Sequence, residues 1–373
     1  MTLIGIGGCT ALLLTGFGLS DSINAIITTQ YGKEGIVHAD CQVAFKNSQT
    51  ASESKDEDSI YQKLIKDENT KDVMMFYSKN ITAFSDTTDE TYSVHFFVPQ
   101  NNEDLKKFVV LQDRTTKTPY SLTDDGVLVT EKIATKLGVK VGENIKLKFS
   151  ESEVREFPVT AIVENYTYHY VYISPALYTK TYSQEPSFNY AFVNYVDAID
   201  SSESESVRSD AQEKLNSYYD VTAVIDIVQT SESFGRMFRS LDYVIMVFIV
   251  SAALLAFVVL YNLTNININE RKREIATLKV LGFHNYESTS YIGRENFVIT
   301  ILGTIGGLIA GIFLHRFVIE VAEVNIVMFG RTIDWTSYVW AVVLTFVFSL
   351  IVSVIMSVTI KRIHMVESLK SIE

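Results

Sequence analysis

Residues Tyr261–Phe283, YNLTNININERKREIATLKVLGF, decide how this chain is organised. The stretch begins inside an apolar run, passes four asparagines and meets the charge cluster Glu270–Glu274, ERKRE. Arginine and lysine are costly in hydrocarbon and are attracted to the anionic lipids of the inner leaflet. We therefore expect a membrane helix to end here, with the cluster on the cytoplasmic side.

A short amphipathic piece follows the cluster. Ile275, Leu278 and Leu281 have helical spacing, and Gly282 is placed where a helix C-cap would be. A capped helix between two membrane spans suits a part that another protein grips. From charge alone, the basic flank of an ordinary membrane helix explains the cluster equally well.

The run ERKREIATLKVLGF resembles the segment after the second span of FtsX-like permeases, the MacB/FtsX/LolC-type subunits of ATP-binding-cassette (ABC) systems. In that family this segment is the coupling element seated on a separate ATPase. The resemblance therefore implies an ABC-type ATPase subunit as partner. The implied electrostatic contacts are Arg271, Arg273, Glu274 and Lys279, and the implied apolar contacts are Ile275, Leu278 and Leu281, with Gly282 closing the segment.

Charge is distributed unevenly along the chain. Residues 31–236 contain 33 Asp and Glu against 21 Lys and Arg, so the whole formal charge of −12 lies in this block. Such a block repels nucleic acid and offers it no basic groove. Proteins, peptides or cationic ligands are the expected partners, and the lipid bilayer is expected around the apolar stretches.

Four apolar stretches predict four transmembrane helices. The polar block predicts a large mixed α/β extracytoplasmic domain of two lobes, inserted between the first and second helices. The predicted parts are a first helix and stalk at 1–30, the domain at 31–232 with lobes of roughly 31–120 and 121–232, a stalk and second helix at 233–269, the coupling segment at 270–290, a third helix at 291–318, an outer loop at 319–336, a fourth helix at 337–360 and a cytoplasmic tail at 361–373.

Turn and capping signals mark short elements within the domain. Asp125-Gly126 precedes a predicted strand at 127–130, and a predicted helix at 131–137 ends at Gly138. The run DGVLVTEKIATKLGVKVGENIKLKF resembles the small extracytoplasmic sub-domain of MacB-type permeases. Further strands are expected at 36–45, 73–77, 92–98, 145–149, 157–163, 189–196 and 221–228, with helices at 60–65 and 201–219 and a helix capped by Thr230.

Alternation puts Tyr166, Tyr168, Tyr170 and Tyr172 on one face of a predicted strand. Exposed rings in such a row stack on an extracellular protein or peptide, which makes this a candidate partner face. Packing of the rings against their own lobe explains the pattern as well, and we favour that explanation. His169 alternates to the opposite face without a second ligand at metal-binding spacing, so no metal site is expected.

Gly303, Gly307 and Gly311 recur every four residues in the third apolar stretch. This spacing places small residues on one helical face and lets another helix approach closely. We expect these glycines to serve helix packing and nothing more.

The sequence lacks the motifs of common catalytic and metal sites. It contains no GxxxxGK[ST] loop, no HExxH helix, no cysteine pair at zinc spacing and no GxSxG elbow. The chain is therefore not expected to be an enzyme or to bind a cofactor, and ATP is expected to be hydrolysed by a separate subunit. Cys9 lies in an apolar stretch and Cys41 in the polar block, so no disulfide is expected between them.

Basic residues near the predicted membrane boundaries favour one orientation. Eight lie on the side of the coupling segment and the C-terminus, against four on the side of the domain. This count predicts a multi-pass protein of the bacterial plasma membrane with the coupling segment and C-terminus in the cytoplasm. Because no Lys or Arg precedes the first apolar stretch, we expect that Met1 is not the natural beginning.

One span, a large outer domain and three further spans, in that order, resemble an FtsX-like permease half. The resemblance implies a subunit that works with an ATPase and a second permease half, as a homodimer or a fused pair, and exports or extracts peptides, lipoproteins or lipids. A regulator that switches an extracellular cell-wall hydrolase or sensor without transport is the alternative. A membrane-tethered binding protein without an ATPase is a third interpretation.

Overall fold

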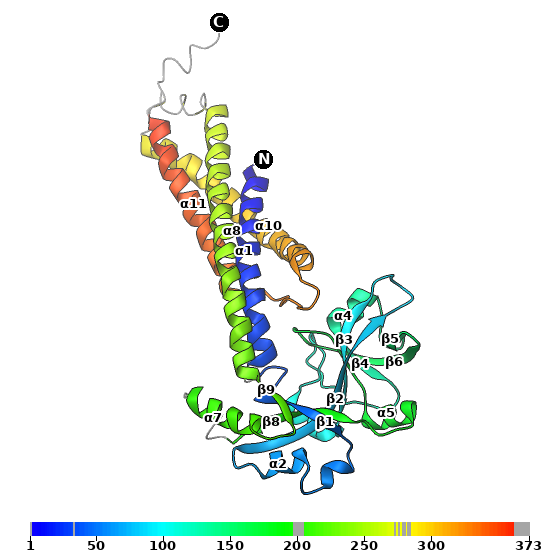
Figure 1. Ribbon diagram of the computed structural model, residues 1–373. Coiled ribbons are helices and arrows are strands. Elements are labelled where there is room, and N and C mark those ends of the chain that lie inside the picture. Colours follow the sequence, from blue (N-terminus) through cyan, green and yellow to red (C-terminus); the bar gives the residue numbers. More distant parts are fainter. Residues whose placement is uncertain are drawn as a thin grey trace. The chain divides into compact units, whose positions relative to one another are not determined.

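The computed structural model describes residues 2–32, 34–196, 205–271, 274, 277, 281 and 285–361. The chain divides into two compact units (Figure 1). A helical unit contains Met1–Asn24, Met237–Glu323 and Phe329–Glu373. The second unit carries the strands and is called the α/β unit; it contains Ala25–Arg236 together with Val324–Met328.

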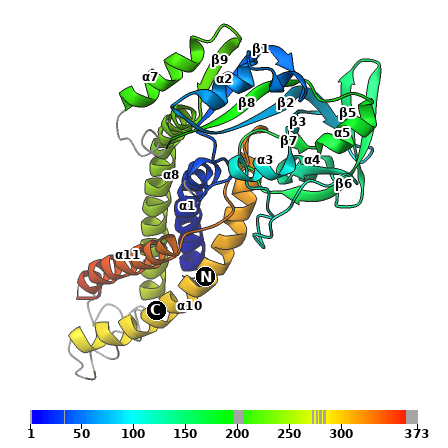
Figure 2. The same cartoon turned by 90° about the horizontal axis from the view of Figure 1, so that it is seen from below.

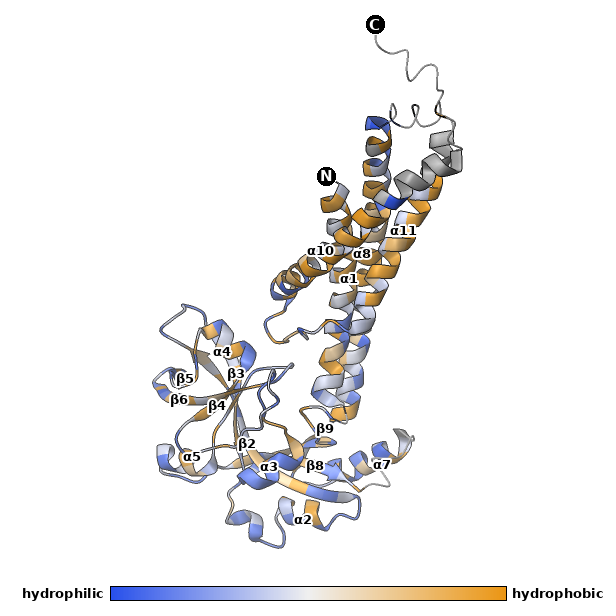
Figure 3. Ribbon diagram, turned by 180° about the vertical axis from the view of Figure 1, so that it is seen from behind, coloured by the Kyte–Doolittle hydropathy of each residue, from blue (hydrophilic) through white to orange (hydrophobic). Residues whose placement is uncertain are grey.

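Among the described residues, four helices are long and apolar enough to cross a membrane. Apolar residues dominate them, as expected of helices whose outer faces meet lipid (Figure 3). The four predicted apolar helices are therefore confirmed, and α8 continues its predicted stalk without a break over 44 residues. The helices are α1 (Thr2–Tyr31), α8 (Ile227–Glu270), α10 (Asn285–Ala322) and α11 (Trp335–Lys361).

Helices α1 and α8 lie side by side in the helical unit (Figures 1 and 2). Small residues of α1 make this approach close. A Cβ atom built on Gly16 would lie 2.8 Å from the side chain of Ile249 in α8. Glycine leaves room for that side chain, so the two helices pack without a gap.

Nine described strands form one mixed sheet in the order β3-β7-β4-β6-β5-β2-β8-β1-β9. Because β2 also pairs with β3, the first six strands of this order close into a ring, and β8, β1 and β9 extend from it. The pairs β3/β7 and β4/β6 are parallel. The strands are β1 (Cys41–Gln49), β2 (Thr70–Phe84), β3 (Tyr92–Pro99), β4 (Val127–Thr130), β5 (Asn144–Ser150), β6 (Glu153–Val163), β7 (Tyr170–Tyr172), β8 (Phe188–Tyr195) and β9 (Val221–Asp226).

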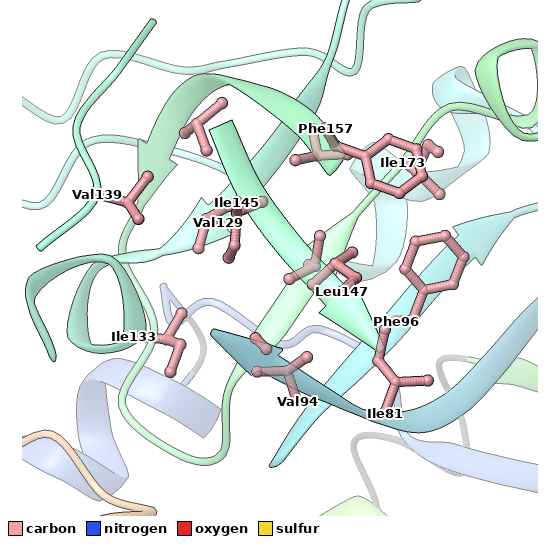
Figure 4. Close-up of a cluster of buried hydrophobic side chains, with 14 of the residues drawn as sticks. Ile81, Val94, Phe96, Val129, Ile133, Val139, Ile145, Leu147, Phe157 and Ile173 are labelled. Carbon is pink, nitrogen blue, oxygen red and sulfur yellow. The ribbon is translucent and has the colours of Figure 1, made fainter. Parts of the chain in front are cut away.

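Short helices cover this sheet and complete two apolar cores. The strands of the ring, with α4 and α5, supply one cluster of buried side chains that includes Phe96, Leu147 and Phe157 (Figure 4). The extension β8-β1-β9, with α2, α7 and the start of β2, supplies the other. The short helices are α2 (Ile60–Lys66), α3 (Asn102–Phe108), α4 (Glu131–Leu137), α5 (Pro175–Tyr182) and α7 (Glu205–Asn216), with a 3-10 turn at Glu53–Lys55.

The predicted division into lobes at residue 120 does not match these cores. Residues 41–75 share a core with residues 188–224, whereas residues 81–98 share the other core with 127–178. The long strand β2 takes part in both, because its first half pairs with β8 and its second half with β3 and β5. The prediction of two lobes that are each contiguous in sequence is therefore wrong, because one sheet runs through both cores.

Two local signals had opposite outcomes. Gly138 ends α4 as predicted, in the left-handed conformation with φ 65° that favours glycine. The predicted cap at Thr230 is wrong, because α8 begins directly after β9. There the Oδ1 atom of Asp226 accepts a hydrogen bond from the N–H of Gln229 at 2.8 Å, and this carboxylate caps the helix.

Candidate functional site

Part of the predicted coupling segment is described, between the end of α8 and the start of α10. Arg271 is half-buried, whereas Glu274 is exposed and Leu281 is 70% exposed. Glu274 and Leu281 are thus both open to solvent. Arg273, Ile275, Leu278, Lys279 and Gly282 lie outside the described residues.

The predicted packing glycines of α10 lie against α1. A Cβ atom built on Gly307 would lie 2.6 Å from the carbonyl oxygen of Gly7, a distance that real side chains do not tolerate. Its neighbour Gly306 has no such atom within 4 Å. The two backbones therefore meet along one face of α10, which we call the glycine seam (Gly303, Gly307 and Gly311).

Hydroxyl groups join the remaining helices of the helical unit. The hydroxyls of Thr10 in α1 and Thr345 in α11 lie 3.1 Å apart, and those of Thr300 in α10 and Ser349 in α11 lie 3.0 Å apart. Hydrogen bonds between helices are favoured in hydrocarbon, where a lone hydroxyl finds no water. A shift of α10 must therefore move α1 and α11 or break these contacts.

The predicted tyrosine face does not exist. Residues 166–169 are not a strand, and Tyr168 has a positive φ of 59°, which breaks the alternation. Tyr168 is 41% exposed, but Tyr166 and Tyr172 are buried. The rings of Tyr170 and Tyr172 stack on each other at 5.5 Å within β7. The rings thus mostly pack within their own unit.

Instead, residues Asn165–His169 hold the end of α1. The Nε2 atom of Gln30 donates to Oδ1 of Asn165 at 2.9 Å, and Oε1 of Gln30 accepts from the N–H of Tyr166 at 2.8 Å. Gln30 is only 2% exposed, so water cannot replace these bonds easily. The hydroxyls of Tyr31 and Thr167 add a contact of 3.1 Å. We call Asn165–His169 the junction segment.

A second stretch of chain, Val324–Met328 between α10 and α11, attaches to the same segment. We call it the connector. The N–H of Tyr168 donates to the carbonyl of Ile326 at 2.8 Å, and the N–H of Met328 donates to the carbonyl of Tyr166 at 2.9 Å. The connector therefore belongs to the α/β unit, although in the chain it lies between the apolar helices α10 and α11.

Two buried side chains clamp the connector. Lys132, which is 4% exposed, directs its Nζ atom at the carbonyl oxygens of Val324 and Val327, each at 2.5 Å. The Nε2 atom of His169 donates to the carbonyl oxygen of Asn325 at 2.8 Å. A buried ammonium is costly unless it is hydrogen-bonded, so Lys132 and the connector stabilise each other.

The start of α8 reaches the same place. The ring of Phe234 stacks against Tyr31 with ring centres 6.4 Å apart and lies edge-on to Tyr168 at 6.5 Å. The N–H of Ile227 donates to the carbonyl of Asp40 at 2.9 Å, which ties the first turn of α8 to the sheet. Within the α/β unit, the ends of α1 and α8 and the connector therefore meet at the junction segment.

The junction segment is expected to loosen in acid. Burial lowers the pKa of His169 to about 4, aided by the nearby ammonium of Lys132. The unfolded chain binds this proton below about pH 6.5, so the contribution to stability is complete above that pH and is lost as the pH falls toward the folded pKa. Amides of residues 164–172 should therefore exchange hydrogen faster at pH 5 than at pH 7, after correction for intrinsic rates.

The control for this prediction is His169→Gln. Its amide can donate to the carbonyl of Asn325 but does not titrate. The extra acid sensitivity of residues 164–172 should disappear in this variant. An unchanged pH dependence would show that His169 is not its source.

The described residues contain no cluster of three or more His, Cys, Asp or Glu side chains that could hold a metal ion. Cys9 and Cys41 are both free and buried. Burial raises the pKa of the Cys41 thiol to about 12, which keeps this group in its unreactive form.

Two family models match the chain. That of the MacB-like periplasmic core domain matches residues 2–214, more than half of the 373 residues. That of the FtsX-like permease C-terminal region matches residues 246–365. The chain belongs to the MacB/FtsX-like permease family. Members are permease components of ABC transporters, which work with an ATPase partner and are not themselves enzymes.

Solved structures similar to this permease cover part of it. The periplasmic region of MacB from Actinobacillus actinomycetemcomitans is 11% identical, covers 54% of this chain and 94% of that chain, and has a TM-score of 0.31. The extracellular domain of the ABC-type transporter YknZ from Gram-positive bacteria is 16% identical, covers 50% of this chain and 100% of that chain, and has a TM-score of 0.29. No curated protein matches the chain.

Sequence reasoning missed the residues that attach this MacB/FtsX-like permease's membrane helices to its α/β unit. Gln30 and the connector carried no motif. Lys132 did carry a signal, because it stands beside Ile133 and Ala134 on the side of α4 that is buried. A lysine between apolar residues of a short helix indicates a buried partner for its charge.

Proposed function

We propose that this chain is the permease subunit of an ABC system that transmits the conformational work of a separate ATPase to the α/β unit. The expected result is export or extraction of peptides, lipoproteins or lipids. ATP is bound and hydrolysed by the ATPase subunit, and a second permease half completes the complex. The observation that carries the proposal is the meeting of α1, α8 and the connector at the junction segment.

The path of the force follows from the chain itself. Dimerisation of the ATPase presses on the coupling segment, which joins α8 to α10. Phe234, in the first turns of α8, contacts Tyr168 of the junction segment. Helix α10 displaces α1 through the glycine seam and continues covalently into the connector. Unequal movement of these parts must deform the α/β unit, and no polar channel through the four apolar helices is required.

In this proposal the α/β unit is inserted between the first two membrane helices and faces away from the cytoplasm. The coupling segment and the C-terminus are cytoplasmic, as the excess of basic residues on that side supports. A Lys140→Cys variant should react with an impermeant maleimide on intact cells, whereas a Lys279→Cys variant should not. The opposite pattern would invert the topology and end the proposal.

Reversing charge in the coupling segment tests the ATPase contact. With Arg273→Glu and Glu274→Arg combined, like charges face each other across the contact, and the stimulated ATPase rate of the assembled complex should fall about tenfold or more. Membrane insertion should not change. Lys140→Glu, on exposed sequence of the α/β unit, is the matched control and should have no effect. Full stimulation in the double variant would argue against this contact.

A further inference from the structure

A large cleft lies on the α/β unit beside the junction segment. Its volume is about 550 Å³, within the range of small-molecule and side-chain binding sites. The sheet supplies one wall and the junction segment another. The rings that line it belong to Tyr31, His95, Tyr168, His169, Tyr170, Tyr190 and Phe192.

The aromatic lining of this cleft is already ordered by ring contacts. His95 stacks on Tyr170 at 5.1 Å, and Tyr190 and Phe192 both pack on Phe76, at 5.5 and 4.5 Å. No Asp, Glu, Lys or Arg is among the described residues that line the cleft. Such a surface favours a flat or branched apolar group and has no ion pair to offer a charged one.

A second cleft of about 600 Å³ adjoins the first and shares Tyr31, Val37 and Ile227 with it. Its lining is different in kind. It carries three carboxylates against one ammonium group, and two of these carboxylates have partners that are themselves well exposed. Exposed ion pairs contribute little, so a cationic ligand can replace them. The carboxylates are Asp40, Asp72 and Glu232, and the ammonium is that of Lys71.

We propose that the two clefts form one binding site for a cationic amphipathic peptide. An aromatic side chain of the peptide enters the uncharged cleft, and its basic side chains lie over the carboxylates of the adjoining one. The −12 charge of the surrounding block attracts such a molecule and repels anionic amphiphiles such as fatty acids.

The site also lies where movement of the membrane helices would reshape it. The aromatic cleft is lined by Tyr31 at the end of α1, Thr230 in the first turns of α8 and Ile326 of the connector. Helix α1, helix α8 and the connector therefore each contribute a residue to the lining of the same cleft. Movement of these helices would release the bound peptide, and this part of the proposal rests on the proposed function. Binding of the peptide does not.

Calorimetric titration of the full chain in phosphatidylcholine nanodiscs, without ATPase, tests the site. The probe is N-acetyl-tryptophanyl-lysyl-lysine amide, and empty nanodiscs give the background. Saturable binding is expected, about tenfold weaker or more when glycine replaces tryptophan or when glutamate replaces both lysines. Equal binding of the glutamate or the glycine peptide would overturn the proposal, as would absence of binding.

Two variants locate the binding. Tyr190→Ser removes one wall of the aromatic cleft, and Ser93→Trp fills the cleft from an exposed position, so each should weaken the probe about tenfold. Tyr219→Ser removes a 78% exposed ring outside both clefts and should change nothing. Binding unchanged in both cleft variants would place the peptide elsewhere and overturn the proposal. Since no ATPase is present, failure here would leave the proposed function standing.

Discussion

Replacing Lys132 with methionine is expected to release the connector from the α/β unit and to abolish most of the coupling between ATP hydrolysis and transport. The side chain keeps its length but loses both hydrogen bonds to the connector, those to Val324 and Val327. The buried carbonyl of Val327 loses a hydrogen bond to a charged group, which contributes about 1.5–3 kcal/mol, whereas the carbonyl of the exposed Val324 keeps its bond from the N–H of Val327. This loss shifts the equilibrium between attached and released connector by a factor of about 10 or more.

Hydrogen exchange measures this release directly. The amides of Met328 and Tyr168 form hydrogen bonds across the contact between the connector and the junction segment, to the carbonyls of Tyr166 and Ile326. In Lys132→Met they should exchange at least tenfold faster, by the same estimate, while β5 and β6 keep their protection. Lys136→Met is the matched control, because Lys136 lies one turn further along α4 and is exposed. Equal exchange rates in both variants would contradict the claim that Lys132 holds the connector on the α/β unit.

The second large effect is expected for Gly307→Leu in the glycine seam. A Cβ atom there meets the carbonyl oxygen of Gly7 and the Cβ of Thr10, both at 2.6 Å, and backbone atoms cannot turn aside as the end of a side chain can. Overpacking of this kind destabilises by about 1–3 kcal/mol or more. Helices α1 and α10 must separate, so we expect a lower thermal stability and loss of stimulated transport.

Gly306→Leu provides the comparison, since it adds the same side chain one residue away. That position has no atom within 4 Å of a built Cβ, so the leucine faces outward. Thermal unfolding and ATP-driven transport of the two variants should be measured side by side. If Gly306→Leu were as damaging as Gly307→Leu, the effect would come from the added bulk in lipid, and the seam would have no special role.

Local signals predicted much of the fold because their physics is local. Four long apolar stretches became four helices, and Gly138 ended α4 where its left-handed conformation was expected. Strand β2 was predicted at 73–77 but runs from Thr70 to Phe84. Its polar stretch Ser78-Lys79-Asn80 lies beyond the predicted end of the strand, yet it pairs with β3 along the ring. Pairing with a partner strand outweighs the local pattern there.

The site was harder to predict because its contacts join distant parts of the chain. Lys132 and Val324 are 192 positions apart, and Gln30 and Asn165 are 135 apart. No periodicity links such pairs. The tyrosine run was misassigned because alternation assumes an unbroken strand, and the positive φ of Tyr168 breaks it. The same turn presents the backbone of residues 166–168 to the connector, so the error fell on the segment that carries the site.

The central claim is that work done on the coupling segment reshapes the α/β unit through the junction segment. Spin labels at Lys66 and Lys140, exposed positions beside the two cores, measure this in the permease assembled with its ATPase in nanodiscs. Binding of ATP to a hydrolysis-deficient ATPase should shift the distance between the labels, and Lys132→Met should remove that shift while Lys136→Met keeps it. The account would be contradicted if the distance still shifted in Lys132→Met, or if it did not shift in the permease that keeps Lys132.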